Sequence, residues 1–320
     1  MKILFYSLSN LLFLLCSCGS QKSVADVLQD IAPNPKEIIF ENNCLVNNEE
    51  GHIQGVQFFN HKRSNYYFFT GSSNNQSYYA IADADHNKIL SVNKFLDEPY
   101  RHPGGFQIAN KWLAVGIEDN IKTDKSKVLL FKILDPKKSD LKLLKTIERS
   151  GPAKRYTAGC VALTKQKKNM LIAVGNWDTK NIDFYSIPSK RLKDPNTNFN
   201  LVYSFDSEQA NRENWIEKTW YSYQNINFVK DAKKVNYLIG TAFDGSTEME
   251  IVDVFEITTS NWDNFELRKV GHRKFKKPAT TTLGWGGGVY QDKRKGIQIF
   301  STGEQITDSL YLNLYLEKGH

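Results

Sequence analysis

The sequence lacks the short motifs that mark the commonest catalytic and metal sites. It contains no Gly-x-Ser-x-Gly nucleophile motif and no His-Glu-x-x-His zinc motif. Neither its four cysteines nor its six histidines show the spacing of metal ligands. Sequence evidence for a serine hydrolase or a zinc enzyme is therefore absent, and function must be argued from the arrangement of the chain.

Residues that favour helices are also scarce. The chain has only three methionines, whereas 15 tyrosines and 19 phenylalanines dominate its aromatic residues, which favours strands. A hydrophobic content of 40% suffices for a packed core. The formal charge of +7 is consistent with nucleic acid, with an anionic membrane surface, or with solubility alone.

The longest apolar segment of the chain lies at the N-terminus, and no other segment is long and apolar enough to span a bilayer. The segment from Ile3 to Leu15 is too short to span comfortably and has the length of a signal-peptide core. Its end, Leu15-Cys16-Ser17-Cys18-Gly19, resembles the lipobox of bacterial lipoproteins, although Cys16 is unusual inside such a box. The resemblance implies that residues 1–17 are removed, that Cys18 carries lipid, and that Gly19 directs the protein to the outer membrane of a two-membrane bacterium. A plain secretory signal and an N-terminal anchor helix are the alternatives.

Two cysteines, Cys44 and Cys160, remain after the signal peptide. An exported protein meets an oxidising compartment, where the two could pair. The repeat order described next places them in different parts of the fold. We therefore expect two buried free thiols.

Glycine is concentrated in LGWGGGVYQDKRKGIQIF, residues 283–300, which could be a phosphate-binding loop or part of a repeat. A phosphate-binding loop requires a following helix, whereas this one is followed by a second apolar strand and a glycine. The same order of strand, polar turn, strand and glycine occurs in five units, at 55–71, 105–116, 159–175, 225–240 and 288–303. The stretch is therefore interpreted as one unit of a repeat.

Each unit is followed by one or two further strands, which makes four strands per unit. This pattern predicts an all-β fold, namely a five-bladed β-propeller with four antiparallel strands per blade. The fifth unit lacks an outer strand, which the N-terminal segment 37–47 could supply by closing the last blade. Six blades, if 188–222 hides strands, or a pair of β-sandwiches are the alternatives. The expected organisation is a signal peptide (1–17), a lipid-anchored tether with a short helix at 23–32 capped by Ser23 (18–36), and the propeller domain (37–320). A second short helix is expected at 207–220.

The propeller order separates the charges onto two faces. The turns between first and second strands contain twelve lysines or arginines, namely 62, 63, 111, 165, 167, 168, 230, 233, 234 and 293–295, against Asp231 and Asp292. Such lysines keep sheet proteins soluble, or they face an anionic membrane surface. Nucleic acid is not expected, because aromatic residues are not interleaved with them.

The turns on the opposite face are acidic and aromatic. Candidate ligand-binding residues there are His102, Glu118, Arg155, Tyr156, Asn176, Trp177, Asp178, Asp244, Trp285 and Glu304. Carboxylates, amides and flat rings around one opening suit a hydroxyl-rich ligand. The same residue types also make ordinary turns after strands. Calcium could be held by the same carboxylate oxygens, although no other cofactor is indicated.

In architecture the chain resembles five-bladed propellers, which include a sugar-binding lectin and glycosidases with essential carboxylates on the innermost strands. The innermost segments of this sequence contain no acid. We therefore expect a monomeric, membrane-anchored protein that binds a glycan or a peptide without catalytic residues. A glycoside hydrolase or lyase using Glu118, Asp178 and Asp244, or a scaffold in an envelope complex, is the alternative.

Overall fold

A computed structural model describes residues 22–261, 264–292 and 296–319. The predicted signal peptide and Cys18 lie outside the described residues. Within the described ranges no helix is long and apolar enough to cross a membrane. The helix α1 (Val24–Asp30) begins after the predicted cap, because Ser23 Oγ accepts the Asp26 N–H and the Asp26 carboxylate accepts the Ser23 N–H.

The second predicted helix is wrong, because residues 207–220 form turns and bends. Side chains in this segment bond to nearby backbone groups: the Glu208 N–H donates to Asp206 Oδ1 and the Glu213 N–H donates to Asn211 Oδ1. Such local bonds compete with helical ones. The segment is instead held by Trp215, which is buried and donates from its indole to the Leu267 carbonyl.

Apart from α1 and two short 3-10 turns, η1 (Pro136–Lys138) and η2 (Ser189–Arg191), the regular structure is all β. The first ten strands are β1 (Lys36–Glu41), β2 (Ile53–His61), β3 (Ser64–Ser72), β4 (Gln76–Asp83), β5 (Lys88–Asp97), β6 (His102–Ala109), β7 (Trp112–Glu118), β8 (Lys125–Asp135), β9 (Asp140–Ser150) and β10 (Cys160–Gln166). They are followed by β11 (Asn169–Gly175), β12 (Asn181–Pro188), β13 (Asn200–Asp206), β14 (Asn225–Lys230), β15 (Asn236–Asp244), β16 (Met249–Asn261), β17 (Asn264–Lys276), β18 (Thr282–Asp292), β19 (Gly296–Thr302) and β20 (Ser309–Tyr315).

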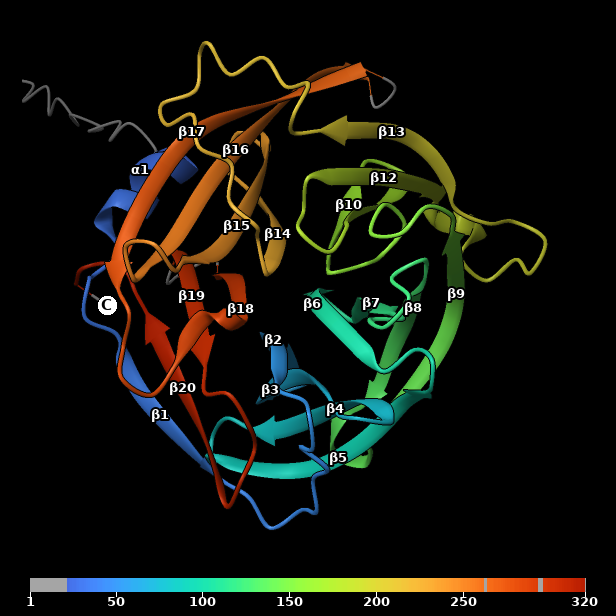
Figure 1. Ribbon diagram of the computed structural model, residues 1–320, viewed down its shortest axis with the longest axis vertical. Helices are drawn as coiled ribbons and strands as arrows, with labels where there is room; N and C mark the ends of the chain where they lie inside the picture. The colour runs from blue at the N-terminus through green and yellow to red at the C-terminus, as the bar shows by residue number, and fades with distance from the viewer. Residues whose placement is uncertain (1–21, 262–263, 293–295, 320) are drawn as a thin grey trace, which may run out of the picture.

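The sheets are larger than the predicted four-stranded units. They comprise a closed set of eight strands, β1-β20-β19-β18-β2-β3-β4-β5, a second sheet of eight, β13-β12-β11-β10-β6-β7-β8-β9, and a sheet of four, β14-β15-β16-β17. Single parallel pairs enlarge them, at Gly55 with Gly287, at Gly105 with Cys160 and at Glu41 with Lys88. Figure 1 shows the antiparallel runs arranged around a centre, with β2, β6 and β18 near it and β5, β9 and β13 at the periphery.

The two ends of the chain pair with each other. Strand β1 forms an antiparallel ladder with β20 from Lys36–Leu314 to Glu41–Ser309. This is the pairing that the spare N-terminal strand predicted, although the strand ends at Glu41 and not at residue 47. Figure 1 shows β1 at the outer edge beside β20.

Glycines within the innermost strands allow those strands to approach closely. A Cβ atom on Gly288 would lie 1.8 Å from the Val56 carbonyl oxygen, and one on Gly104 would lie 2.1 Å from the Gly159 carbonyl oxygen. No side chain fits at such distances. The glycine-rich stretch at 283–288 therefore serves strand packing in β18, and no helix follows it.

Apolar side chains of neighbouring strand runs pack together between the sheets. One cluster combines Ile182 and Phe184 of β12 with Ile251 and Phe255 of β16. Cys160 is buried in this cluster, whereas Cys44 is half-buried elsewhere, and both are free thiols.

Candidate functional site

Two cavities lie at opposite ends of the five innermost strands, β2, β6, β10, β14 and β18. The upper cavity, of about 320 Å³, is lined by residues at or just before the start of these strands and by residues at or after the ends of β3, β7 and β11. The lower cavity, of about 690 Å³, is lined by residues near their ends. We call the corresponding ends of the molecule the upper face and the lower face.

Buried amide side chains link the innermost strands between the two cavities. Gln107 Nε2 donates to the Phe228 carbonyl, and its Oε1 accepts the N–H groups of Phe228 and Leu163. Asn227 bonds in the same way to the Phe106 carbonyl and the Val289 N–H. These bonds satisfy polar groups that would otherwise be costly to bury.

The upper cavity contains a hydrogen-bonded pair of His102 and Glu118. Glu118 is fully buried at the end of β7, and its Oε1 lies 3.0 Å from His102 Nδ1. Its Oε2 accepts the Ala158 N–H at 2.7 Å. The His102 ring stacks on Trp177, with ring centroids 5.1 Å apart and planes inclined by 26°. Trp177 remains 41% exposed, so part of its ring is available at the opening.

A second histidine, His52, extends this polar wall. The His52 ring meets that of His102 edge to face at 6.4 Å, and its Nδ1 lies 2.8 Å from the Ile53 carbonyl oxygen. Burial, together with the neighbouring His102, lowers the pKa of His52. Gln54 Nε2 lies 3.1 Å from His52 Nε2, and Gln54 Oε1 accepts a bond from Gln224 at 2.7 Å. His52 is therefore neutral near pH 7 and presents a neutral imidazole to the cavity.

Of the ten candidate residues from the sequence, four line the upper cavity: His102, Glu118, Trp177 and Trp285. They come from β6, β7, the turn after β11, and β18, so the fold brings together residues that are far apart in the sequence.

Three other candidates, Asn176, Asp178 and Asp244, make turns outside the lining of this cavity. Asn176 Oδ1 accepts the Asn181 N–H, and the Lys180 N–H points at Asp178 Oδ1 from 3.4 Å. Asp244 accepts bonds from Ser246 and Thr247, and these bonds lower the pKa of its carboxyl. Asp and Asn side chains commonly bond to the backbone two residues onward in this way.

Arg155, Tyr156 and Glu304 also lie outside the lining. The Arg155 guanidinium clamps the Asp183 carboxylate through bonds of 2.7 and 2.8 Å, and its charge stacks over Tyr156 at 4.9 Å. Glu304 is exposed, and its backbone carbonyl accepts the Ile53 N–H. The arginine is therefore used in an internal ion pair and does not face the cavity lining.

Sequence reasoning missed His52, Gln54 and Gln224. One signal could have found His52: it precedes Gly55 by three residues, as His102 precedes Gly105. The two glycines occupy corresponding places, since each forms the parallel pair to a neighbouring innermost strand. Aligning the repeat on these glycines would have placed both histidines at the same opening.

No metal centre is assembled in the part of the chain that the structure describes, where no group of three or more His, Cys, Asp or Glu could hold an ion. The predicted calcium ligands are separated by their own bonds, because Glu118 is bound to His102 and Asp244 to Ser246 and Thr247. The carboxylates thus fit their protein partners and not a shared cation.

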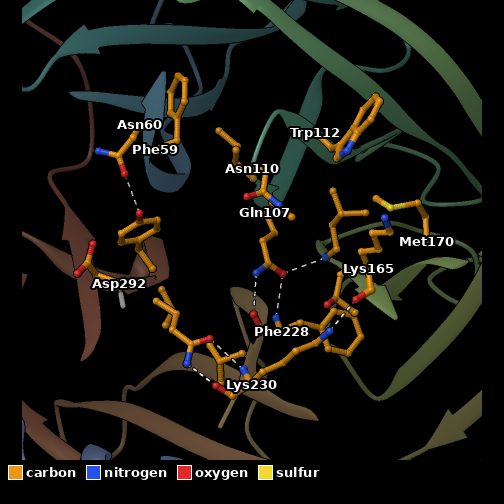
Figure 2. Close-up of a pocket in the computed structure, with 18 residues that line it drawn as sticks. Phe59, Asn60, Gln107, Asn110, Trp112, Lys165, Met170, Phe228, Lys230 and Asp292 are labelled. Atoms are coloured by element: carbon orange, nitrogen blue, oxygen red, sulfur yellow. Dashed lines mark hydrogen bonds between the residues drawn. The ribbon is translucent and has the colours of Figure 1, made fainter. Parts of the chain in front are cut away.

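The lower cavity combines apolar walls with amides and lysines (Figure 2). The Tyr290 hydroxyl donates to Asn60 Oδ1, and Lys230 Nζ donates to the Lys165 carbonyl at 2.6 Å. The indole of Trp112 lies at the side of this cavity, and the Lys111 ammonium is 5.5 Å from its ring centroid. This opening was predicted only as a set of basic turns.

One buried carboxyl group near the upper face is poorly satisfied. Glu250 Oε2 accepts the Leu283 N–H at 2.9 Å, but Oε1 has no hydrogen-bond partner among the described residues. Burial raises the pKa of Glu250 from its ordinary 4.5 to about 7. The folded state therefore holds this proton more tightly than the unfolded state does.

We expect the free energy of unfolding to fall as pH rises from about 4.5 to 7, by roughly 3 kcal/mol from this group. Glu250→Gln should abolish that decline and stabilise the protein at pH 8, as measured by urea unfolding at several pH values. The control is Glu248→Gln, an exposed neighbour that should leave the pH profile unchanged. An identical slope in wild type and Glu250→Gln would contradict the assignment.

Comparisons with known proteins return structural likeness only. No protein-family model matches the sequence, and no curated protein matches it. Among solved structures, the chain is similar to a hypothetical protein from Leishmania major, with 8% identity, 89% of this chain and 91% of that chain covered, and a TM-score of 0.49.

It is also similar to the Dos1 propeller (11% identity, 82% and 54% covered, TM-score 0.36) and to the GH43_1 enzyme from Xanthomonas citri complexed with xylotriose (9% identity, 82% and 86% covered, TM-score 0.46). These neighbours include propellers and glycoside hydrolases. Because all three TM-scores lie below 0.5, the functional argument rests on the geometry of this chain.

Proposed function

We propose that the protein is a five-bladed β-propeller, lipid-anchored at Cys18 to the bacterial outer membrane, that binds a glycan in its upper cavity. The single observation that carries the binding proposal is the half-exposed ring of Trp177, stacked on His102 beside the buried carboxylate of Glu118.

The five-bladed interpretation is supported by the strand pairing. Five antiparallel runs of four can be drawn, β2–β5, β6–β9, β10–β13, β14–β17 and β18–β20 completed by β1. The links between runs are single residue pairs, whereas the ladders within runs extend over many residues. We therefore interpret the larger sheets as blades joined by single residue pairs, two of them between innermost strands and one between the outer strands β1 and β5.

The lining of the upper cavity suits a hydroxyl-rich ligand. Trp177 and Trp285 offer flat apolar faces, which cover the apolar faces of sugar rings. Ser222 and Gln224 offer hydroxyl and amide groups, which can both donate and accept hydrogen bonds. A few polar groups among aromatic walls are typical of a binding pocket.

The hydrogen bonds of Glu118 favour binding over hydrolysis. Both of its oxygens already have partners, His102 and the Ala158 N–H, so the carboxylate positions His102 and the chain segment before β10. A glycosidase of the usual kind needs a second carboxyl group across the scissile bond. The glycoside hydrolase alternative is favoured by one observation: Glu50 also lines the cavity.

We expect Trp177→Ala to weaken glycan binding by about thirtyfold, or about 2 kcal/mol, because the exposed stacking face is lost. Binding would be measured by calorimetry after screening an oligosaccharide array that includes xylotriose, the ligand named for one structural neighbour. The matched control is Trp112→Ala on the lower face, which should bind normally.

The same samples, analysed for cleaved sugars, separate the two functions. Intact oligosaccharide with Trp177-dependent binding supports a binding protein. Cleavage that is lost in Glu118→Gln would establish the hydrolase instead. An array with neither binding nor cleavage would contradict both functions and leave a protein-interaction scaffold. Binding that is unchanged in Trp177→Ala would contradict the proposed binding site.

A further inference from the structure

The described chain begins on the lower face. Lys22 and Ser23 lie beside the turn between β14 and β15, where they line a small hollow with Asp231 and Lys233. The segment that follows is firmly attached: Leu28 is buried and the Ala32 N–H donates to the Leu316 carbonyl at 2.7 Å. The N-terminal segment therefore reaches the domain at its lower face.

This position limits the distance between the lower face and the proposed lipid. Lys22 lies four positions after Cys18, and a fully extended chain covers at most about 3.5 Å per residue. An acylated Cys18 would thus hold the membrane surface within roughly 14 Å of Lys22. The lower face then lies nearer to the membrane than the upper cavity does.

The lower face carries a concentration of exposed positive charge. We define the basic ring as eight residues on four inner turns around the lower cavity: Lys62, Arg63, Lys111, Lys165, Lys167, Lys168, Lys233 and Lys234. All eight are exposed. None forms an ion pair with a residue inside the described ranges. The acid on these four turns is Asp231, which accepts the Val235 N–H, and a second acid, Asp292, ends the innermost strand β18.

The upper face is mixed in charge. Its exposed acids include Glu49, Glu50, Glu248, Glu304 and Asp308, and its exposed lysines include Lys122 and Lys154. An anionic surface would therefore attract the lower face more strongly than the upper face. Trp112 adds a second feature to the lower face, because an amphipathic indole beside a lysine, here Lys111, suits the level of lipid headgroups.

We propose that the basic ring is a membrane-docking surface that contacts anionic lipid headgroups and directs the upper cavity away from the membrane. Each lysine or arginine near an anionic bilayer contributes about fivefold to the binding constant. Three or four engaged at once, beside a short lipid tether, suffice to hold one orientation. The proposal rests on the proposed lipid anchor at Cys18 but not on glycan binding, because the basic ring lies on the face opposite the upper cavity.

The test uses the full lipidated protein in vesicles of phosphatidylcholine, with or without phosphatidylglycerol. Labelling with an amine-reactive reagent, read by mass spectrometry, compares Lys167 and Lys168 of the basic ring with Lys122 and Lys154 on upper-face loops. All four lysines are exposed. We expect Lys167 and Lys168 to label at least fivefold more slowly with phosphatidylglycerol present, and this protection to disappear at 1 M salt, where charge interactions are screened.

Charge-reversal variants complete the test. Lys167→Glu/Lys168→Glu should abolish the protection of the remaining basic-ring lysines. Lys122→Glu/Lys154→Glu changes the net charge equally and should leave it intact. Any one of four results would overturn the proposal. They are equal labelling of both faces, protection independent of lipid charge, failure to associate with either vesicle, and equal effects of the two variants. Glycan binding in both variants reports separately on the upper cavity.

Discussion

Asp253→Asn is expected to lower the free energy of unfolding by about 3 kcal/mol, because it removes the nearer carboxylate from a buried ammonium group and leaves only Glu217, whose Oε2 lies 3.4 Å from Lys269 Nζ. Asp253 and Lys269 are both fully buried, and Lys269 Nζ lies 2.7 Å from Asp253 Oδ2. The same carboxylate accepts the Tyr223 hydroxyl at 2.5 Å and lies 2.6 Å from His272 Nδ1. One substitution therefore disturbs three partners. Urea unfolding at pH 7 measures the loss.

Two further variants show whether the charge is responsible. Asp97→Asn removes the carboxylate of an exposed ion pair with Lys94, and should cost less than about 1 kcal/mol. Adding Lys269→Met to Asp253→Asn should recover part of the lost stability, because an apolar chain replaces the poorly compensated buried charge. If Asp253→Asn alone is as stable as Asp97→Asn, the buried ion pair of Asp253 and Lys269 contributes little to stability.

Phe40→Ala is expected to destabilise the protein by about 3–5 kcal/mol, as removing a buried aromatic ring from a core usually does. Phe40 is fully buried on β1, and its ring meets those of Tyr67 and Phe69 edge to face at 5.3 and 5.9 Å. Strand β1 pairs with β20 along its length and with β5 at a single residue pair. The loss of the Phe40 side chain should therefore also weaken the pairing of β1 with β20. Thermal unfolding and hydrogen exchange of the β20 amides measure the two effects.

The neighbouring residue on the same strand provides the control. Ile39 points to the other side of β1 and is 46% exposed, so Ile39→Ala should cost about 1 kcal/mol or less. Equal destabilisation by the two substitutions would contradict the burial pattern. Faster exchange in β20 without loss of global stability would show that β1 can detach while the other sheets stay folded.

Much of the architecture could be predicted because its signals are local. The alternation of apolar and polar residues, the glycines at strand starts and the polar turns are read within a few residues, and they located strands over most of the chain. The cap at Ser23 is equally local, which explains why α1 was found. The helix expected at 207–220 failed because its polar side chains bond to the adjacent backbone, which composition alone does not reveal.

The candidate site could be predicted only in part. The carboxylates of Glu118, Asp178 and Asp244 look alike in the sequence, since each lies at or after the end of the second strand of a repeat unit. The structure gives Glu118 the ring of His102 and the Ala158 N–H as partners, whereas Asp244 accepts bonds from its own turn. The direction of a side chain after a strand depends on the backbone of the turn and on the neighbouring run.

The sequence by itself determined the strand order, the repeat, the ends of the chain that pair and the concentration of lysines on one set of turns. These properties follow from residue type and spacing. Only the tertiary structure decided that His52 and His102 share one cavity, that Arg155 is occupied by Asp183, and that Lys22 lies on the same face as the basic ring. Those relations join segments far apart in the chain, and their distances depend on how the sheets pack around the centre.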